Sequence, residues 1–370
     1  DERDTVSRQG GDEFAILLRG YSNLTRIADI AQRLIDAVAP PFLIDGHELR
    51  VGASIGISTY PHDGADIGTL LKNADTAMYQ AKAGGGNAYQ FFTAEMNARI
   101  LDRVAMENSL RRALARREFM LHYQPQVDGT SGRLVGVEAL IRWRHPDLGE
   151  VPPARFIPIA EESGLINGIG DWVLEEACRQ ARTWMDRGLP PLTMAVNLSA
   201  VQFRQRDLAD KVAAVLGQTG LPAERLELEI TESAFIHDTD RIVGILGQLK
   251  AHGIKLSVDD FGTGYSSLGY LKRLPFDKIK IDQSFVRDLP DNEDDIAITQ
   301  AIIGIAGSLK KELIAEGVET LPQRDFLLHL GCRMMQGYHF SRPVPPAAIE
   351  AMLQQAADGP PRQNSSRTRQ

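Results

Sequence analysis

The sequence predicts an α/β fold, a closed (β/α)8 barrel preceded by a smaller domain of mixed helices and strands. The chain has 370 residues, enough for two domains at about 150 residues each. From Phe119 onward, short apolar runs alternate with amphipathic stretches, and this alternation is typical of βαβ units. Eight apolar runs within about 230 residues suit a barrel, whose usual size is ~250 residues. An open doubly wound sheet is the alternative, but no GxGxxG turn follows the first run.

Residues 1–92 form the first block. Its expected strands are Phe14–Leu18 and Leu49–Tyr60, and its expected helices are Ser22–Val38 and Ile67–Ala83. The glycines that begin at Gly84 end the second helix, as glycine does at a helix C-terminus. A connecting helix is expected over residues 93–117, because apolar residues recur there at helical spacing. Its arginine-rich end is interpreted as a solvated helix face, with an anion site as the alternative.

The second block supplies the barrel. Its strands are expected at residues 120–124, 134–141, 193–198, 226–231, 254–259, 278–282, 312–316 and 334–338. Helices are expected between them at residues 171–187, 206–219, 239–252, 294–308 and 321–330. The polar, proline-bearing end of the chain, residues 356–370, is expected to be a disordered tail.

Composition narrows the class of protein. The net charge of −8 argues against a partner that is a DNA or RNA polymer, but it allows a small nucleotide held by metal ions. Cys178 and Cys332 lie far apart, which favours a reducing cytosol over a disulfide framework or a zinc site. No apolar stretch reaches the ~20 residues that span a bilayer. The chain is therefore expected to be cytoplasmic. It begins without Met, so we expect a fragment of a parent protein that can carry an anchor upstream.

Charged and amide side chains recur near the ends of the expected barrel strands. In a barrel, catalytic groups project from the C-terminal ends of strands, so these side chains should meet. Buried carboxylates without partners would cost several kcal/mol each. Oxygen ligands suit Mg²⁺ or Mn²⁺, and two such ions are a common device for attack on a phosphodiester. The sequence thus predicts a two-metal site whose ligands are Glu138, Asn197, Glu229, Asp259 and Asp260.

Lys280 is expected to act with this site. Alternation in FDKIKID places Lys278, Lys280 and Asp282 on one face of a strand. A lysine that faces a carboxylate-lined interior can orient an attacking water or stabilise a phosphorane. The alternative is a structural ion pair with Asp282 or Glu316.

The glycine-rich segment after Asp260 predicts a tight turn beside the site. Glu232, three residues after Glu229, is hypothesised to steady this turn by hydrogen bonds. An ordinary βα turn is the alternative.

Eight motifs in chain order resemble the EAL family of cyclic-di-GMP phosphodiesterases, over residues 101–355. They are YQP at Tyr123–Pro125, EAL at Glu138–Leu140, NLS at Asn197–Ser199, EITE at Glu229–Glu232, DDFGTGYSSL at Asp259–Leu268, KIKID at Lys278–Asp282, AEGVE at Ala315–Glu319 and QGY at Gln336–Tyr338. The resemblance implies a modified TIM barrel whose first strand runs antiparallel to the rest. It also implies hydrolysis of cyclic-di-GMP to linear pGpG with two Mg²⁺ or Mn²⁺ ions.

The resemblance assigns roles to individual residues. It keeps Glu138, Asn197, Glu229, Asp259 and Asp260 as metal ligands. Lys280 and Glu316 would contact the nucleophilic water, with Glu316 as general base. The implied substrate contacts are Gln124, Leu140, Arg142 and Gln336, and the implied supports of the loop after Asp260 are Glu232 and Glu319. A homodimer through the barrel domain is expected by the same analogy.

The first block resembles the second half of the GGDEF domain of diguanylate cyclases. RQGGDEFAILL carries the signature, and SIGIS, ADTAMYQAK and GGGNAYQFF follow in order. Gly10, Gly11, Asp12 and Glu13 would form a partial site, with GTP as its implied ligand. Because no residues precede Asp1, the family's N-terminal segment is missing, and we expect that the chain as given does not make cyclic-di-GMP.

The sequence therefore predicts a cyclic-di-GMP phosphodiesterase of bacterial second-messenger signalling. Two alternatives stay open: a receptor that binds cyclic-di-GMP without cutting it, and a bifunctional cyclase and phosphodiesterase in a longer parent protein.

Overall fold

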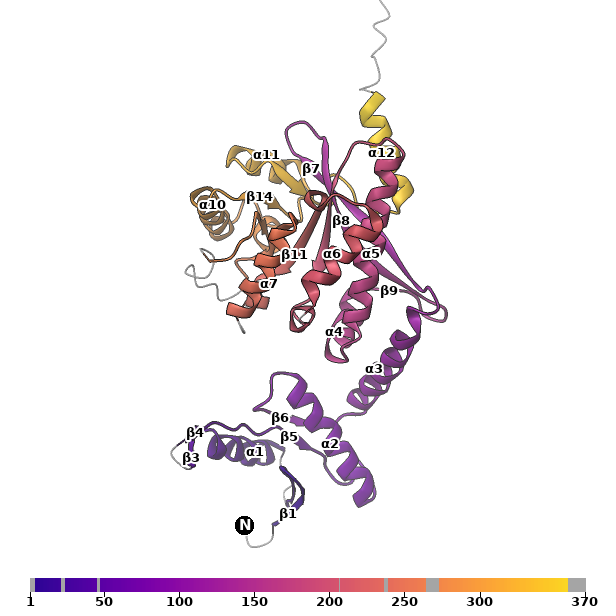
Figure 1. Cartoon of the computed structure of the whole chain (residues 1–370). Helices are drawn as coiled ribbons and strands as arrows, with labels where there is room; N and C mark the ends of the chain where they lie inside the picture. The colour runs from indigo at the N-terminus through magenta and orange to yellow at the C-terminus, as the bar shows by residue number, and fades with distance from the viewer. Residues whose placement is uncertain are drawn as a thin grey trace, which may run out of the picture. The chain divides into compact units, whose positions relative to one another are not determined.

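The computed structural model describes residues 4–20, 24–44, 47–205, 207–235, 239–263 and 273–358. The chain divides into two compact units, residues 1–106 and 107–370 (Figure 1). Within the described ranges, no helix combines the length and the apolar character that crossing a bilayer requires.

Three two-stranded sheets and two helices build the described part of unit 1. The antiparallel pairs are β1 (Thr5–Gly10) with β2 (Glu13–Leu17) and β3 (Phe42–Ile44) with β4 (His47–Leu49), and the parallel pair is β5 (Ile55–Ile57) with β6 (Tyr89–Phe91). The helices are α1 (Leu24–Val38) and α2 (Ile67–Ala83). A further helix, α3 (Ala94–Ala113), crosses the boundary between the units.

Helix α2 matches its predicted range because both of its ends are fixed locally. The side chain of Asp66 accepts a hydrogen bond from Thr69 N at 2.9 Å, and the N–H of Gly84 donates to the last turn. The helix packs directly on β5 through Gly56, where a Cβ would come within 1.8 Å of Ala74 O. Glycine is therefore required at this crossing.

The strand expected over Leu49–Tyr60 was wrong in its extent. β4 ends at Leu49, and β5 covers only Ile55–Ile57. Between them the backbone turns toward Asn87, whose Oδ1 accepts a hydrogen bond from Ala53 N at 3.4 Å. In a continuous strand, the N–H of Ala53 would be free to bond to a neighbouring strand. Here it bonds to the side chain of Asn87 instead.

Unit 2 is a closed barrel of eight strands, as predicted. They are β7 (Phe119–Asp128), β8 (Leu134–His145), β10 (Thr193–Leu198), β11 (Leu226–Thr231), β12 (Lys255–Phe261), β13 (Lys278–Ile281), β14 (Glu312–Ala315) and β15 (Met334–Gln336). The sheet closes where β8 pairs with β10. β7 runs antiparallel to both of its neighbours, which confirms the expected reversal of the first strand. The short strand β9 (Gly149–Val151) extends the sheet from β8.

Helices surround the barrel strands (Figure 1). Among the described residues they are α4 (Pro153–Glu162), α5 (Ile166–Asp186), α6 (Leu208–Thr219), α7 (Thr239–Ala251), α9 (Gln283–Val286), α10 (Glu293–Ser308), α11 (Leu321–His329) and α12 (Pro346–Asp358). Sequence analysis missed α4, α9 and α12. Of these, α4 contains Pro158 and α12 follows a proline-rich segment, features that normally end helices. Residues 356–358 complete α12, and the rest of the expected tail lies outside the described residues.

The barrel strands are buried on both faces, and this places polar groups inside. On β11, Leu228 and Ile230 alternate with Glu227 and Glu229, and each of the four is at most 1% exposed. Successive side chains of a strand point to opposite faces, so one set packs under the helices while the other enters the barrel. Charged residues inside a protein need partners, and these partners define the site.

Candidate active site

The ammonium group of Lys280 lies among four carboxylates inside the barrel. Its Nζ is 2.6 Å from Glu229 Oε2, 2.7 Å from Glu316 Oε1, 3.0 Å from Asp259 Oδ1 and 4.0 Å from Glu138 Oε2. Lys280 is 1% exposed. We call these five residues the Lys280 cluster. Its members come from β8, β11, β12 and β13 and from the residue that follows β14.

Two amide side chains border the cluster. Asn197 Nδ2 donates to Glu138 Oε1 at 2.6 Å, and Asn197 is paired in register with Glu229 on the next strand. Gln336 Nε2 donates to Glu138 Oε2 at 2.5 Å and to Gln124 Oε1 at 3.1 Å. The structure thus brings two of the three amides in the expected metal and substrate sets, Asn197 and Gln336, onto the same carboxylate, and the third, Gln124, onto Gln336.

A break in the strand explains how two aspartates stand side by side. The pairing of β12 with β13 shifts between Val258 and Phe261, and Asp260 has a left-handed φ of +53°. In a regular strand Asp260 would point to the helix face. The irregular backbone lets it face another direction, while Asp259 stays inside and accepts a hydrogen bond from Asp260 N at 3.0 Å.

Burial and the neighbouring charges shift the pKa values of the site. Burial raises the pKa of Glu229 well above its usual value, and Glu138 and Asp259 add to this against the opposing effect of Lys280. Burial also raises the pKa of Glu316 to about 8, despite Lys280. For Lys280, burial lowers the pKa, but the surrounding carboxylates outweigh it and raise the value well above normal.

Asp260 shows the same effect at a more open position. Burial raises its pKa to about 6, and the charge of Asp259 contributes. With all four carboxylates ionised, the Lys280 cluster would carry three net negative charges, and ionised Asp260 would add a fourth. The raised pKa values of Glu229, Glu316 and Asp260 mean that burial opposes this ionisation and that a bound cation would restore it. The site therefore favours the binding of cations.

The residues fit divalent cations by donor type. The carboxylate and amide oxygens form an oxygen-only set, which hard cations prefer. Glu229 Oε1 is buried and has no hydrogen-bond partner among the described residues. Among the described residues, no three Asp, Glu, His or Cys side chains are arranged to hold a metal ion. The ammonium of Lys280 lies within 3.0 Å of Glu229 and Asp259. Metal binding would therefore compete with the ammonium for Glu229 and Asp259.

Leu140 and Arg142 follow Glu138 on β8 by two and four positions. Arg142 Nη1 donates to the carbonyl oxygen of Ile141 at 2.9 Å, and its Nε is 3.8 Å from Glu150 Oε1. Leu140 is half-buried and pairs with His122 on β7. Their assignment to substrate stays a prediction.

The expected loop supports differ in position. Glu232 is buried, and its Oε2 accepts a hydrogen bond from Gly262 N at 2.8 Å, in the turn after Asp260. Glu319 is exposed, and its backbone N–H donates to Gln323 Oε1 at the start of α11. Residues 264–272 of the glycine-rich loop lie outside the described residues.

Asp282 does not continue the alternation of β13. The strand ends at Ile281, and Asp282 instead caps α9 by accepting a hydrogen bond from Ser284 N at 3.0 Å. The ion-pair partners of Lys280 are carboxylates of the cluster, among them Glu316.

Sequence reasoning missed a second buried pair. Lys278 Nζ is 2.9 Å and 2.6 Å from the two carboxylate oxygens of Glu227. The two-residue period of a strand could have predicted this pair. Glu227 and Lys278 each precede a cluster residue by two positions, so they lie on the same strand face as that residue.

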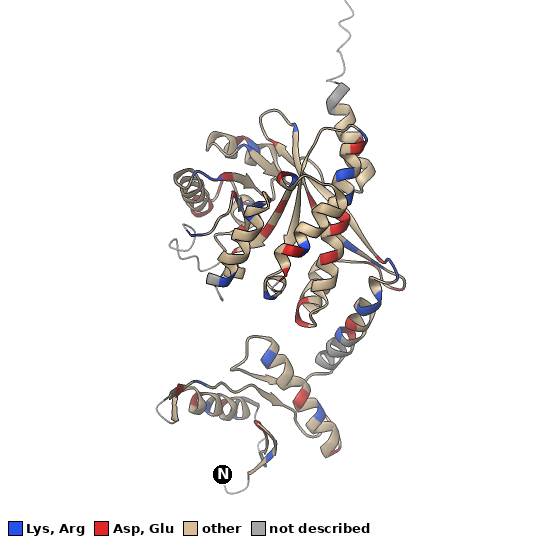
Figure 2. Cartoon of the chain, in the orientation of Figure 1, with Lys and Arg blue, Asp and Glu red and all other residues tan. Residues whose placement is uncertain are grey.

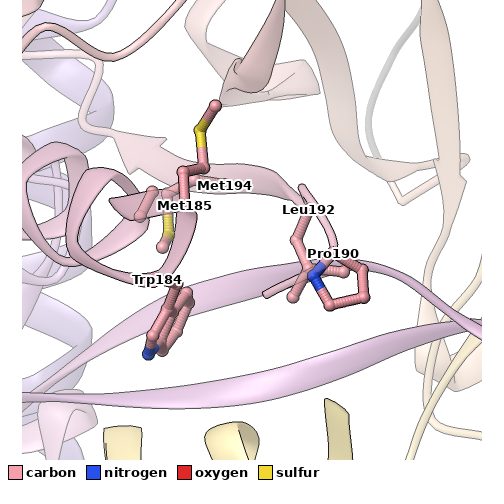
Figure 3. Close-up of a pocket in the computed structure, with 6 residues that line it drawn as sticks. Trp184, Met185, Pro190, Leu192 and Met194 are labelled. Atoms are coloured by element: carbon pink, nitrogen blue, oxygen red, sulfur yellow. The ribbon is translucent and has the colours of Figure 1, made fainter. Parts of the chain in front are cut away.

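Two cavities lie elsewhere in unit 2. One, of about 10 Å³, is enclosed by residues of α5 and β10 and the segment between them (Figure 3): Ala181, Trp184, Met185, Pro190, Leu192 and Met194. Such a volume holds at most about one water molecule. A groove of about 490 Å³ lies beside β7 and includes Trp172 and Pro345. Neither contains a member of the Lys280 cluster.

The partial site of unit 1 is an exposed hairpin. β1 and β2 meet at Gly10 and Glu13, and Gly11 has a left-handed φ of +51°. Arg8 holds the turn by two hydrogen bonds to Gly11 O, at 3.0 Å and 2.6 Å. Asp12 and Glu13 are exposed.

Comparison with known proteins finds two families. The EAL domain family matches residues 107–343, and the family described as "Diguanylate cyclase, GGDEF domain" matches residues 1–88. Among curated relatives, the bifunctional diguanylate cyclase/cyclic di-GMP phosphodiesterase MucR of Pseudomonas aeruginosa is 47% identical over 351 residues, which is 95% of this chain and 51% of MucR. The cyclic di-GMP phosphodiesterase NbdA of the same organism is 44% identical over 355 residues, 95% of this chain and 45% of NbdA.

A solved structure titled "PaMucR Phosphodiesterase, c-di-GMP complex" has a TM-score of 0.64 and 48% sequence identity, and the match covers 66% of this chain and 99% of that one. This chain spans about half the length of the two curated relatives named above. The EAL domain family covers residues 107–343, and the match to the solved structure extends over nearly the full length of that structure. The chain therefore belongs to the EAL domain family and carries a GGDEF-type region at its N-terminal side.

Proposed function

We propose that this chain hydrolyses cyclic-di-GMP to linear pGpG, using two divalent cations, Mg²⁺ or Mn²⁺, in bacterial second-messenger signalling. The Lys280 cluster carries the proposal, since it gathers four carboxylates around one buried ammonium within a barrel. The names of the relatives support the substrate. The solved complex with c-di-GMP supports it as well.

The proposed metal ligands are Glu138, Asn197, Glu229, Asp259 and Asp260. When bound, divalent cations would supply positive charge to the phosphodiester and lower the pKa of water near it. This charge would also offset the three to four net negative charges that the site carries when its carboxylates are ionised. The chain's own carboxylates fix where that charge is placed.

Glu316 and Lys280 are the proposed catalytic pair. As water attacks phosphorus and the P–O3′ bond breaks, Glu316 accepts one proton of the water, and the departing O3′ takes up a proton from solvent to become the 3′-hydroxyl of pGpG. Lys280, 2.7 Å from Glu316, orients this carboxylate and stabilises negative charge that develops on the phosphoryl oxygens. Gln124, Leu140, Arg142 and Gln336 would bind the nucleotide, and Glu232 with Glu319 would support the loop after Asp260.

The finer assignments concern domains, partners and location. The proposed partition is a partial GGDEF domain over 1–92, a connecting helix over 93–117, an EAL domain over 101–355 and a tail over 356–370. A homodimer through the EAL domain and GTP binding at the hairpin of unit 1 rest on family resemblance. Cytoplasmic location is supported by two buried, unpaired cysteines.

The test is to incubate the purified chain with cyclic-di-GMP and Mg²⁺ or Mn²⁺ and to identify the product by chromatography. We expect pGpG from the wild type, and none from Glu138→Ala or Asp259→Ala, because each removes a charged metal ligand. Calorimetry on the same samples separates hydrolysis from mere binding. Folded wild-type protein that binds cyclic-di-GMP without forming pGpG would support a receptor instead.

A further inference from the structure

A second buried ion pair lies one step deeper in the barrel than the Lys280 cluster. Glu227 is 1% exposed and Lys278 is 4% exposed. Lys278 Nζ lies 2.9 Å from Glu227 Oε1 and 2.6 Å from Glu227 Oε2, so one ammonium engages both oxygens of one carboxylate. This pair is balanced in charge, unlike the cluster next to it.

The Lys278–Glu227 pair and the Lys280 cluster form two layers of the barrel interior. Each layer joins a lysine of β13 to a glutamate of β11. Lys278 pairs with Glu227 and Lys280 with Glu229, each 51 residues earlier. β12 lies between the two strands. Its residue Ser257 is fully buried and aligned with Glu229 on one side and Lys278 on the other. A side chain as short as serine leaves room for Lys278 to reach Glu227.

The neighbouring layer offers a competing partner. Glu229 is two residues from Glu227 on the same strand face, about 6.6 Å along the strand at 3.3 Å per residue. Its Oε1 is buried and has no hydrogen-bond partner in the described part of the chain. A buried lysine that loses its own carboxylate is costly, so it would turn to the nearest available one. A lysine stem is long enough to cover that distance.

We propose that Glu227 is a positioning residue, which holds Lys278 away from Glu229 and so reserves a Glu229 oxygen for a divalent cation. This inference rests on the proposed function, since it concerns the same metal site. Without Glu227, the ammonium of Lys278 competes with the cation for Glu229. Substitution of residues that support the metal ligands typically weakens metal affinity about 10–100-fold, and we expect a loss in that range when Glu227 is replaced.

The experiment titrates the 370-residue chain with Mn²⁺ and follows free Mn²⁺ by electron paramagnetic resonance, so no turnover is needed. Glu227→Gln should raise the Mn²⁺ dissociation constant about 10–100-fold. The double variant Glu227→Gln/Lys278→Met removes the competitor and should bind Mn²⁺ within a few fold of the wild type. Ser257→Ala alters the same layer without changing its charge, and it should leave the dissociation constant unchanged. Circular dichroism verifies folding.

Two results would overturn the inference. One is an unchanged dissociation constant in folded Glu227→Gln, and the other is a double variant as weak as the single one. If Glu227→Gln does not fold, Glu227→Asp replaces it, because a shorter carboxylate loosens its hold on Lys278. An unchanged dissociation constant there also contradicts the inference. Wild-type protein that binds no Mn²⁺ removes the proposed function with it, whereas wild-type binding with unaffected variants overturns this inference alone.

Discussion

Lys280 supplies the only ammonium that the described structure places among the carboxylates Glu138, Glu229, Asp259 and Glu316. Such a buried cation can serve stability, catalysis or both. The carboxylates around it keep its pKa well above normal despite burial, so it stays charged at neutral pH. A permanently charged group suits the stabilisation of a transition state better than the transfer of protons.

Lys280→Ala is therefore expected to lower kcat about 10²–10³-fold while changing the affinity for cyclic-di-GMP less than tenfold. The measurement compares steady-state rates with calorimetric binding, at saturating metal. Lys310→Ala, at an exposed lysine, is the matched control and should resemble the wild type. Equal losses of rate and affinity would contradict a role in the transition state.

The thiols of both cysteines should be unreactive toward thiol reagents in the folded protein. Burial raises the pKa of Cys178 and of Cys332 to about 12, and the thiolate is the reactive form. We expect no reaction with Ellman's reagent at pH 8 and reaction of both thiols after unfolding in guanidinium. Because an unfolded thiol ionises near pH 8.5, the free energy of unfolding should fall as pH rises above that value. Rapid labelling of the native chain would contradict the burial.

The turn after β12 links backbone geometry to the site. Asp260 has a left-handed φ, which is uncommon for residues other than glycine and persists where the surroundings hold it. Glu232 provides such a constraint through its hydrogen bond to Gly262 N. The position of Asp260 thus depends on a residue outside the Lys280 cluster.

Glu232→Ala should lower turnover about 10–100-fold, because the turn that positions Asp260 loses its support. Glu232→Gln keeps an oxygen that can accept the same hydrogen bond, so it should retain most of the activity. Rates and melting temperatures of both variants are the measurement. If Glu232→Ala and Glu232→Gln reduce turnover equally, then turnover depends on the charge of this carboxylate rather than on its hydrogen bond, and the expectation is contradicted.

A carboxylate of helix α12 bonds to the end of α5 and to the residue that follows it. Glu350 accepts hydrogen bonds from Trp184 Nε1 at 3.1 Å and from Arg187 Nη1 at 2.7 Å and 2.8 Å. Hydrogen bonds of this kind contribute about 1–3 kcal/mol each when one partner is charged.

Glu350→Ala should lower Tm by about 2–4 °C for each kcal/mol lost while leaving kcat intact. Differential scanning calorimetry measures the first quantity and pGpG formation the second. Gln354→Ala, at an exposed position of the same helix, is the control. A Glu350→Ala variant with unchanged Tm and impaired turnover would contradict a purely structural role for Glu350.

The sequence predicted the barrel because its strands and most of its helices repeat a strong local pattern. The register of β11 and β13 follows from alternation, so the strand period alone places Glu229 and Lys280 inside the barrel. The bulge at Asp260 and the capping role of Asp282 depend on neighbouring strands and on α9, which alternation alone does not reveal. Short elements such as β9 carry too few residues for a periodic signal.

Charge organises the protein at two levels. Over the helices, acidic and basic residues are interspersed (Figure 2), in keeping with a net charge of −8 on 370 residues. Inside the barrel the balance is different, because the Lys280 cluster holds four acids and one base. A bound cation would let these carboxylates ionise despite their burial.

The dependence of pGpG formation on divalent cations tests this account most directly. The chain is stripped with EDTA, exchanged into metal-free buffer and given cyclic-di-GMP, and the product is followed by chromatography before and after Mg²⁺ or Mn²⁺ is restored. We expect no pGpG without metal and renewed turnover with it. Equal turnover in both states, or none after metal is returned to folded protein, would contradict the account.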